Sequence, residues 1–221
     1  MKKYISDYLW FLALLCMAPP FLVGCQKTYY KTMEAFGYHK RDLLVERVED
    51  ARDAQEAAKE QFQSALEKFT EVVGFSGGEL EEKYKELKAE LEKSEMRADA
   101  VKGHIDDVED EAEDLFNEWE SELSQYSSDN LRRSSEQKLD LTRRRYAQLI
   151  GAMKRAEEKI DPVLTAFQDQ VLFLKHNLNA QAVASLQDEL VSVEADIESL
   201  IKEMEASIAE ANSFIEAMGK E

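Results

Sequence analysis

Cysteine, proline and glycine are scarce in this sequence. Its 221 residues include two cysteines, three prolines and eight glycines. Cys16 lies in the N-terminal apolar segment, which leaves Cys25 alone in the remainder of the chain, so a disulfide framework and a cysteine metal site are both excluded. Sheet proteins need many turns, and so few glycines and prolines favour long helices instead.

Positive charge is also in short supply. The chain has 28 lysines and arginines against 46 aspartates and glutamates, for a net charge of -18 at pH 7. A protein this acidic repels the phosphate backbone, and we therefore expect no nucleic-acid partner. Charged residues make up 33% of the chain, which is typical of helices with well-solvated outer faces.

The signatures of common catalytic and metal sites are missing as well. There is no Ser-His-Asp pattern, no nucleophilic cysteine and no glycine-rich phosphate loop. A di-iron bundle needs a glutamate three residues before its histidines, but Phe36, Val101 and Phe173 occupy those positions. The acidic run 106–111 lacks the glycine-bearing loop of a calcium site. We expect no metal, no cofactor and no enzymatic activity.

The N-terminus, by contrast, carries a clear targeting pattern. Lys2 and Lys3 precede the apolar segment Tyr8–Ala18, whose length suits a signal-peptide core and is short for a membrane span. The alternative is an uncleaved anchor helix. Pro19 and Pro20 argue against it, because they would interrupt a spanning helix where it needs more length. We predict a signal peptide over residues 1–24.

The residues that follow match the bacterial lipobox, in which cleavage precedes a cysteine that is then acylated, for example with palmitate. This lipobox is Leu22, Val23, Gly24 and Cys25. The next residue is Gln26 and not aspartate, which is the usual signal for retention at the inner membrane. We therefore expect a lipid-anchored protein on the periplasmic face of the outer membrane, in a Gram-negative envelope.

Residues 25–41 form the lipidated N-terminus and a tether. This segment is basic and aromatic, with Lys27, Tyr29, Tyr30 and Lys31 near its start and His39, Lys40 and Arg41 at its end. One interpretation places these side chains on anionic lipid headgroups, where amphipathic rings prefer the interface. The other is a plain tether with solvated charges, and the sequence leaves both open.

Residues 42–221 show the hydrophobic spacing of a helical bundle. Apolar residues alternate steps of three and four, which is the seam of coiled-coil-like packing. The pattern predicts helices from Asp42 to Val73, from Glu79 to Tyr126, from the turn at Ser128 to Leu174, and from Gln181 to Met218. Short turns join them, so the fold class is all-α: an elongated antiparallel bundle of about four long helices, on the order of 70 Å in length. Aromatic residues on the seam are expected in the core; these are Phe62, Tyr84, Trp119 and Phe167.

Three local features of the bundle follow from the turns and breakers. Gly74 is expected to end the first helix in the left-handed conformation. Ser128 or Asp129 is the expected N-cap of the third helix. Pro162 either kinks that helix or starts a new one, and the kink is favoured because the apolar spacing continues across it.

Charges suggest how the second and third helices pair. If the chain folds back about Ser128, Glu111 and Glu113 lie opposite Arg145 and Arg143, so that the acidic run 106–114 is neutralised across the hairpin. The seam does not decide whether the four helices close on themselves or pair with a second chain, because the same residues serve either arrangement.

Several segments resemble the bacterial domain-of-unknown-function family 2959, over essentially the whole chain after the signal peptide. They are 29–34, 37–42, 45–53, 125–128, 131–133, 161–164 and 174–180. The resemblance implies a helical, lipoprotein-like envelope protein, and it supplies no activity and no catalytic residues. Two groups of residues are not explained by the seam and are candidate binding surfaces: His39, Lys40 and Arg41, and Lys175, His176, Asn177 and Asn179.

Three classes of function are compatible with this sequence. The first is a non-enzymatic envelope lipoprotein whose helical rod acts as a scaffold or spacer, with the membrane as partner through its lipid and with an envelope protein or a second copy as further partner. The alternative is a binding module that recognises an envelope protein, peptidoglycan or lipid through the basic N-terminal segment or the 175–180 turn. An enzyme is the third and least favoured class.

Overall fold

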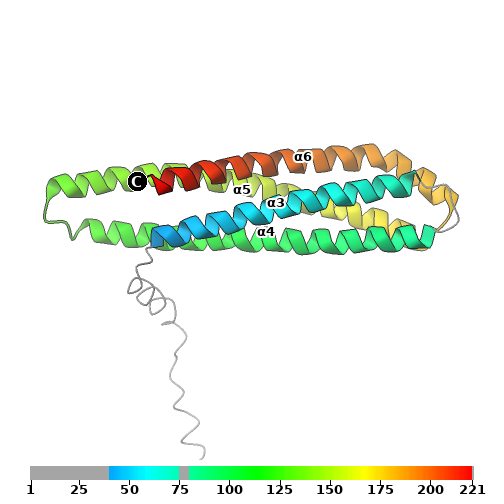
Figure 1. Ribbon diagram of the computed structural model, residues 1–221, viewed down its shortest axis with the longest axis horizontal. Coiled ribbons are helices and arrows are strands. Elements are labelled where there is room, and N and C mark those ends of the chain that lie inside the picture. Colours follow the sequence, from blue (N-terminus) through cyan, green and yellow to red (C-terminus); the bar gives the residue numbers. More distant parts are fainter. Residues whose placement is uncertain (1–39, 75–79, 221) are drawn as a thin grey trace, which may run out of the picture. The chain divides into compact units, whose positions relative to one another are not determined.

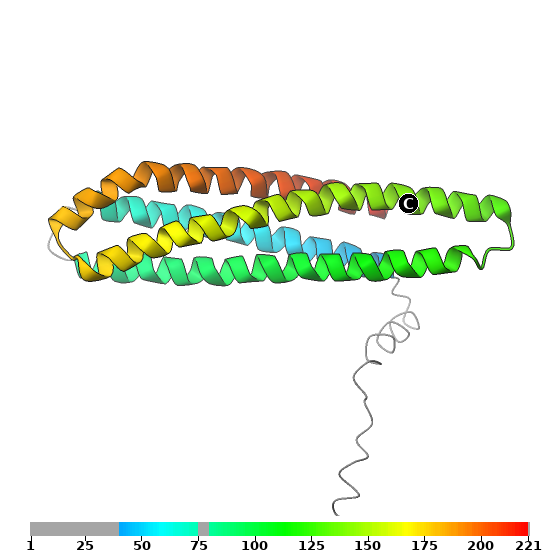
Figure 2. The same ribbon diagram turned by 180° about the vertical axis from the view of Figure 1, so that it is seen from behind.

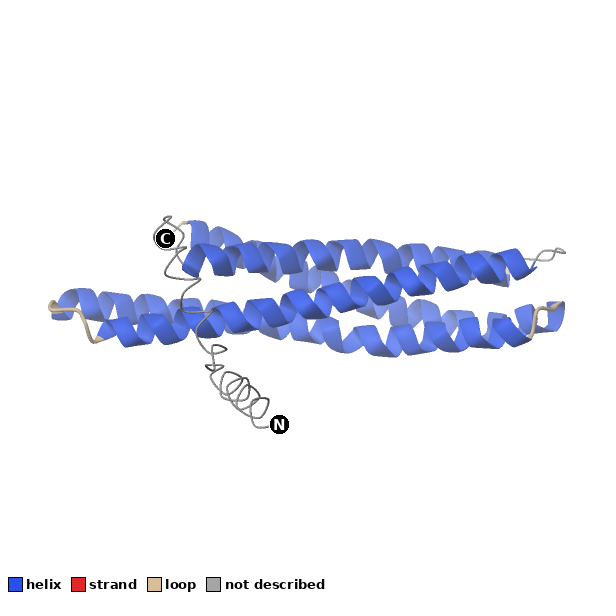
Figure 3. Cartoon of the chain, turned by 90° about the horizontal axis from the view of Figure 1, so that it is seen from below, coloured by secondary structure: helices blue, strands red, loops and turns tan. Residues whose placement is uncertain are grey.

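The computed structural model describes residues 40–74 and 80–220, all of which belong to one unit of the chain. Four long helices account for most of them: α3 (Lys40–Val73), α4 (Leu80–Leu123), α5 (Asp129–His176) and α6 (Ala180–Gly219) (Figures 1 and 3). No β-strand occurs within these ranges. The expected all-α class is confirmed. The lipobox with Cys25 and the candidate binding residue His39 lie outside the described residues.

The helix boundaries lie close to those expected from the sequence. Helix α3 begins at Lys40, two residues before the expected start, so Lys40 and Arg41 are helical. Ser128 is the N-cap of α5, and its hydroxyl accepts a hydrogen bond from the Leu131 N–H at 3.4 Å. Helix α5 runs through Pro162 without a break, which excludes a new helix starting at that proline.

Two expectations at helix ends are wrong. Gly74 does not adopt the left-handed conformation; its N–H donates to the Thr70 carbonyl at 3.0 Å and so continues the helical pattern. Helix α4 ends at Leu123, three residues before the expected end at Tyr126. The Gln125 N–H bonds to the Glu122 carbonyl at 2.9 Å, a tighter spacing than the α-helical one, and this leaves Tyr126 in the turn and exposed.

Each helix packs against two others, and the four close into a bundle within one chain. Helix α3 contacts α4 and α6, and α5 contacts the same two helices. Neighbouring helices run antiparallel, as Figure 1 and the opposite view in Figure 2 show. The apolar stripe of every helix is therefore covered by its own chain. This settles, for the described residues, the alternative that the sequence left open.

The core follows the predicted seams. Phe62, Phe69 and Phe167 are almost fully buried, and the rings of Phe69 in α3 and Phe167 in α5 lie 5.8 Å apart across the bundle. Each such side chain contributes about 1.5–3 kcal/mol through burial of apolar surface. The other two seam aromatics, Tyr84 and Trp119, are only partly buried against the core.

Pairing between α4 and α5 differs in part from the expected register. Arg143 contacts the Glu120 carboxylate at 2.6 Å and not Glu113, which is one heptad away. Side chains lean toward the N-terminus of their own helix, so partners on antiparallel helices have higher residue numbers than a simple fold about the turn predicts. Neutralisation of the acidic run across the hairpin is nevertheless present, because Lys154 lies 2.8 Å from Glu109 and 3.7 Å from Asp106.

Candidate binding surfaces

The two groups of residues singled out in the sequence lie at opposite ends of the bundle. Lys40 and Arg41 open α3, whereas Lys175 and His176 close α5 and the asparagines 177 and 179 follow in the turn to α6. Helices α3 and α5 run in the same direction (Figure 1). The 34 residues of α3 therefore separate the two ends by about 50 Å, at 1.5 Å per residue. They cannot form one site.

Lys40 and Arg41 hold the first turn of α3 against both of its neighbours. The Lys40 ammonium lies 3.2 Å from the Glu118 carboxylate of α4, and it also donates to the Asp114 carbonyl at 3.5 Å. The Arg41 guanidinium donates to the Met218 carbonyl near the end of α6. These contacts give both cations a structural role in closing the bundle.

The turn at the other end is built by its two asparagines. The Asn177 side-chain amide donates to the Phe173 carbonyl at 2.9 Å. Asn179 is the N-cap of α6, and its side-chain oxygen accepts from the N–H groups of Gln181 and Ala182, each at 3.0 Å. Lys175 and His176 are exposed in the last turn of α5, where a positive charge complements the helix dipole. Of this group, therefore, Lys175 and His176 are the residues available to a partner.

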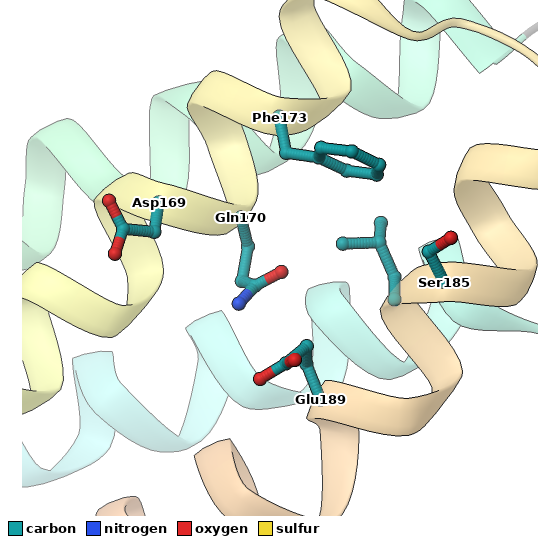
Figure 4. Close-up of a pocket in the computed structure, with 6 residues that line it drawn as sticks. Asp169, Gln170, Phe173, Ser185 and Glu189 are labelled. Carbon is teal, nitrogen blue, oxygen red and sulfur yellow. The ribbon is translucent and has the colours of Figure 1, made fainter.

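A pocket that the sequence did not predict lies beside this turn, between α5 and α6. It has a volume of about 330 Å³. Three residues of α5 and three of α6 line it: Asp169, Gln170, Phe173, Ser185, Leu186 and Glu189. Figure 4 shows the Gln170 and Phe173 side chains extending from α5 into the space that faces Ser185 and Glu189 on α6. The pocket is thus a feature of the α5–α6 pair.

The pocket combines an apolar wall with unpaired polar groups. Leu186 is buried beneath it, and the Phe173 side chain is 39% exposed. Gln170 is only 9% exposed, yet its amide makes no hydrogen bond to any residue in the described part of the chain. Asp169 and Glu189 are exposed, and neither forms an ion pair within residues 40–74 or 80–220. An apolar ligand bearing a cation would satisfy all of these groups.

Little in the sequence points to this pocket. Phe173 stands beside the seam residue Leu174, and Gln170 stands beside Val171, so a periodicity argument assigns them to the helix flanks. Phe173 and Gln170 differ from other flank residues only because α5 and α6 are spaced apart beside them. This spacing depends on packing in three dimensions. The polar turn at 175–180 was the nearest available signal.

Shifted pKa values elsewhere trace to structural contacts between helices. Burial alone would lower the pKa of Lys154, but hydrogen bonds from its ammonium to Glu109 and Glu157 reverse this effect and raise it. Burial likewise opposes the shift at Glu90, where hydrogen bonds from Lys93 and Gln61 lower the carboxyl pKa. These ionised groups join neighbouring turns and helices, and none of them lines the α5–α6 pocket.

The described residues contain neither a candidate metal site nor a candidate membrane-spanning helix. No group of three or more histidines, cysteines, aspartates or glutamates within residues 40–74 and 80–220 has the arrangement of a metal site. Over the same ranges, none of the helices combines the length and the apolar character that crossing a bilayer requires.

Comparison with known proteins places the chain in a family. The model of the family described as "Protein of unknown function (DUF2959)" matches residues 29–218. No curated protein and no solved structure is significantly similar to the chain. The match spans α3, α4 and α5 and all but the last residue of α6. The chain therefore belongs to the DUF2959 family.

Proposed function

We propose that this protein is a lipoprotein on the periplasmic face of the outer membrane and acts as a non-enzymatic helical spacer or scaffold of the cell envelope. The observation that carries this proposal is the connection between a lipobox and a self-contained bundle. Helix α3 begins fifteen residues after Cys25, and from there the chain closes its own apolar seams. A short tether thus joins the anchor to a stiff body.

The dimensions of the helices suit a spacer. Helices α4 and α5 contain 44 and 48 residues, so each is about 65–70 Å long at 1.5 Å per residue. Four such helices packed side by side resist bending far better than an extended linker. The acidic surface, at a net charge of -18 for the chain, favours solubility and discourages non-specific association.

The anchor rests on the N-terminal sequence. Cleavage before Cys25 would leave a thiol and a new amino group to be acylated, and more than one acyl chain gives stable attachment where a single chain gives only marginal binding. The tether from Gln26 to His39 has fourteen residues and reaches at most about 50 Å when fully extended. The bundle would accordingly remain close to the membrane.

Shortening the rod tests the spacer function. We would delete seven residues from each helix: 58–64, 90–96, 152–158 and 200–206. Gln61 of the first segment meets Glu90 of the second, and Arg155 of the third meets Glu203 of the fourth. Whole heptads preserve the seam, so the variant should fold and be shorter by about 10 Å. If length matters, this variant fails to complement the envelope defect of a deletion strain. Full complementation would contradict a spacer.

The alternative is a binding module that acts through the α5–α6 turn. The observation favouring it is the exposure of Lys175 and His176 beside a pocket whose carboxylates, Asp169 and Glu189, form no ion pair within the described residues. Replacing both residues with alanine leaves the bundle contacts intact, so loss of complementation by this variant at full rod length would favour the binding module. The equivalent change at Lys40 and Arg41 would be ambiguous, because it also removes contacts to α4 and α6.

A further inference from the structure

We infer that the α5–α6 pocket binds a segment of a partner protein that carries a lysine or arginine next to a large aliphatic side chain. The inference goes beyond the spacer function and holds whether or not Cys25 is acylated. It rests on the pocket lined by Gln170, Phe173 and Glu189 and on the charges at its mouth.

The Gln170 side chain is the first feature of the pocket that points to a ligand. Gln170 is 91% buried, lines the pocket and has no hydrogen-bond partner among the described residues. The amide atoms of Gln170 are not among the fully buried, unpartnered polar atoms of the described residues, so they reach the solvent in the pocket. A ligand with a peptide group or an amine at this point would replace that water with a hydrogen bond to the amide. Figure 4 shows the Gln170 amide between Phe173 and Glu189, in the space a ligand would enter.

Charge complementarity is the second feature that points to a ligand. The carboxylates of Asp169 and Glu189 stand on the two helices that border the pocket, and neither forms an ion pair within the described ranges. Their charges are part of the chain's net charge of -18, which attracts cations and repels anions. A lysine or arginine side chain placed in the pocket would lie beside the Glu189 carboxylate, with the charge of Asp169 on the rim of α5 adding to the attraction.

Apolar surface in and around the pocket favours a protein segment over a small amine as the ligand. The Phe173 ring and Leu186 form the apolar wall of the pocket. Further apolar surface continues at this end of the bundle, where Leu172 and Leu178 are 54% and 43% exposed. A free amine would leave this surface in water, whereas a peptide with adjacent aliphatic side chains would cover it.

Defined peptides test the inference on the full chain in nanodiscs of zwitterionic lipid. The probes are three fluorescein-labelled octapeptides, one alternating leucine with lysine, one leucine with glutamate and one serine with lysine. Fluorescence anisotropy is read against empty nanodiscs. We expect binding of the leucine–lysine peptide alone. No binding of this peptide, or equal binding of all three, would overturn the inference.

Two charge-matched variants locate the site. Asp169→Asn with Glu189→Gln should weaken binding of the leucine–lysine peptide about tenfold, since both negative charges at the pocket are removed. Asp196→Asn with Glu198→Gln removes the same charge from exposed positions further along α6 and should leave the affinity unchanged. If both variants weaken binding equally, the peptide responds to net charge alone and the pocket is not its site. Thermal melts of both variants confirm that they remain folded.

Discussion

Gln55 is a polar residue in the largely apolar core of this bundle. It lies on the seam of α3 with no exposed surface, and neither its amide nitrogen nor its amide oxygen has a hydrogen-bond partner within the described residues. Burying an amide without a partner costs about 1–3 kcal/mol. A polar residue at a seam position can instead serve to fix helix register.

We therefore expect Gln55→Leu to raise the free energy of unfolding by about 1–3 kcal/mol, because an apolar side chain of similar volume replaces the unsatisfied amide. Urea denaturation followed by circular dichroism measures the change. Gln61→Leu is the matched control on the same helix. Gln61 donates to the Glu90 carboxylate at 2.7 Å, so its replacement should lower stability. Destabilisation by both variants would show that Gln55 has a partner in solution.

Tyr146 carries a shifted pKa whose consequence is measurable. Burial against the core, with smaller effects from Glu109 and Glu113, raises the pKa of its hydroxyl to about 12. Its ring packs edge-on against Phe116 at 5.5 Å. Since the folded-state pKa is the higher one, the unfolded state loses its proton first, and this contribution to stability is lost between about pH 10 and pH 12.

An ultraviolet titration of wild type minus Tyr146→Phe should show one phenol ionising near pH 12. Over the same range, the wild type should lose more stability than the variant. A difference spectrum with a midpoint near the ordinary value of about 10 would mean that Tyr146 is solvated in solution.

At the scale of the helices, hydrophobic periodicity and N-capping residues were enough to predict where most helices begin and end. All four helices were predicted to within a few residues, since each has an apolar seam many turns long and Ser128 provides a strong N-cap. The ends that failed, at Gly74 and Tyr126, depend on single backbone conformations. Partner choice also failed for Arg143, because long side chains reach along the helix as well as across it.

Pro162 is the clearest local conflict within an element. It lies exposed inside α5, where it removes an N–H donor and its ring crowds the preceding turn. Pro162→Ala should raise the free energy of unfolding by up to about 3 kcal/mol. Thr165→Ala, at an exposed position one turn further on, should have a much smaller effect. Lower stability of Pro162→Ala would show that α5 needs the proline to curve around the bundle.

At the scale of the helical unit, the sequence did not predict that the four helices close into a bundle within one chain. The seams predicted four helices, but only the contact of α3 with α6 shows that one chain covers all of its own apolar faces. The candidate binding surface was likewise predicted only in part. The turn at 175–180 could be found as a polar interruption of the seam, whereas the pocket beside it depends on the separation of α5 and α6. The hydrophobic period of one helix does not show which residues of another helix lie opposite it across the bundle.

The proposed envelope function depends on attachment of the bundle to a membrane through Cys25. Labelling cells with radioactive palmitate, with and without the signal-peptidase inhibitor globomycin, tests this most directly, and Cys25→Ser is the control. We expect label on the wild-type protein in the outer-membrane fraction, a larger precursor when globomycin is present, and no label on Cys25→Ser. An unlabelled wild-type protein, insensitive to globomycin and recovered from the cytosol, would contradict the account.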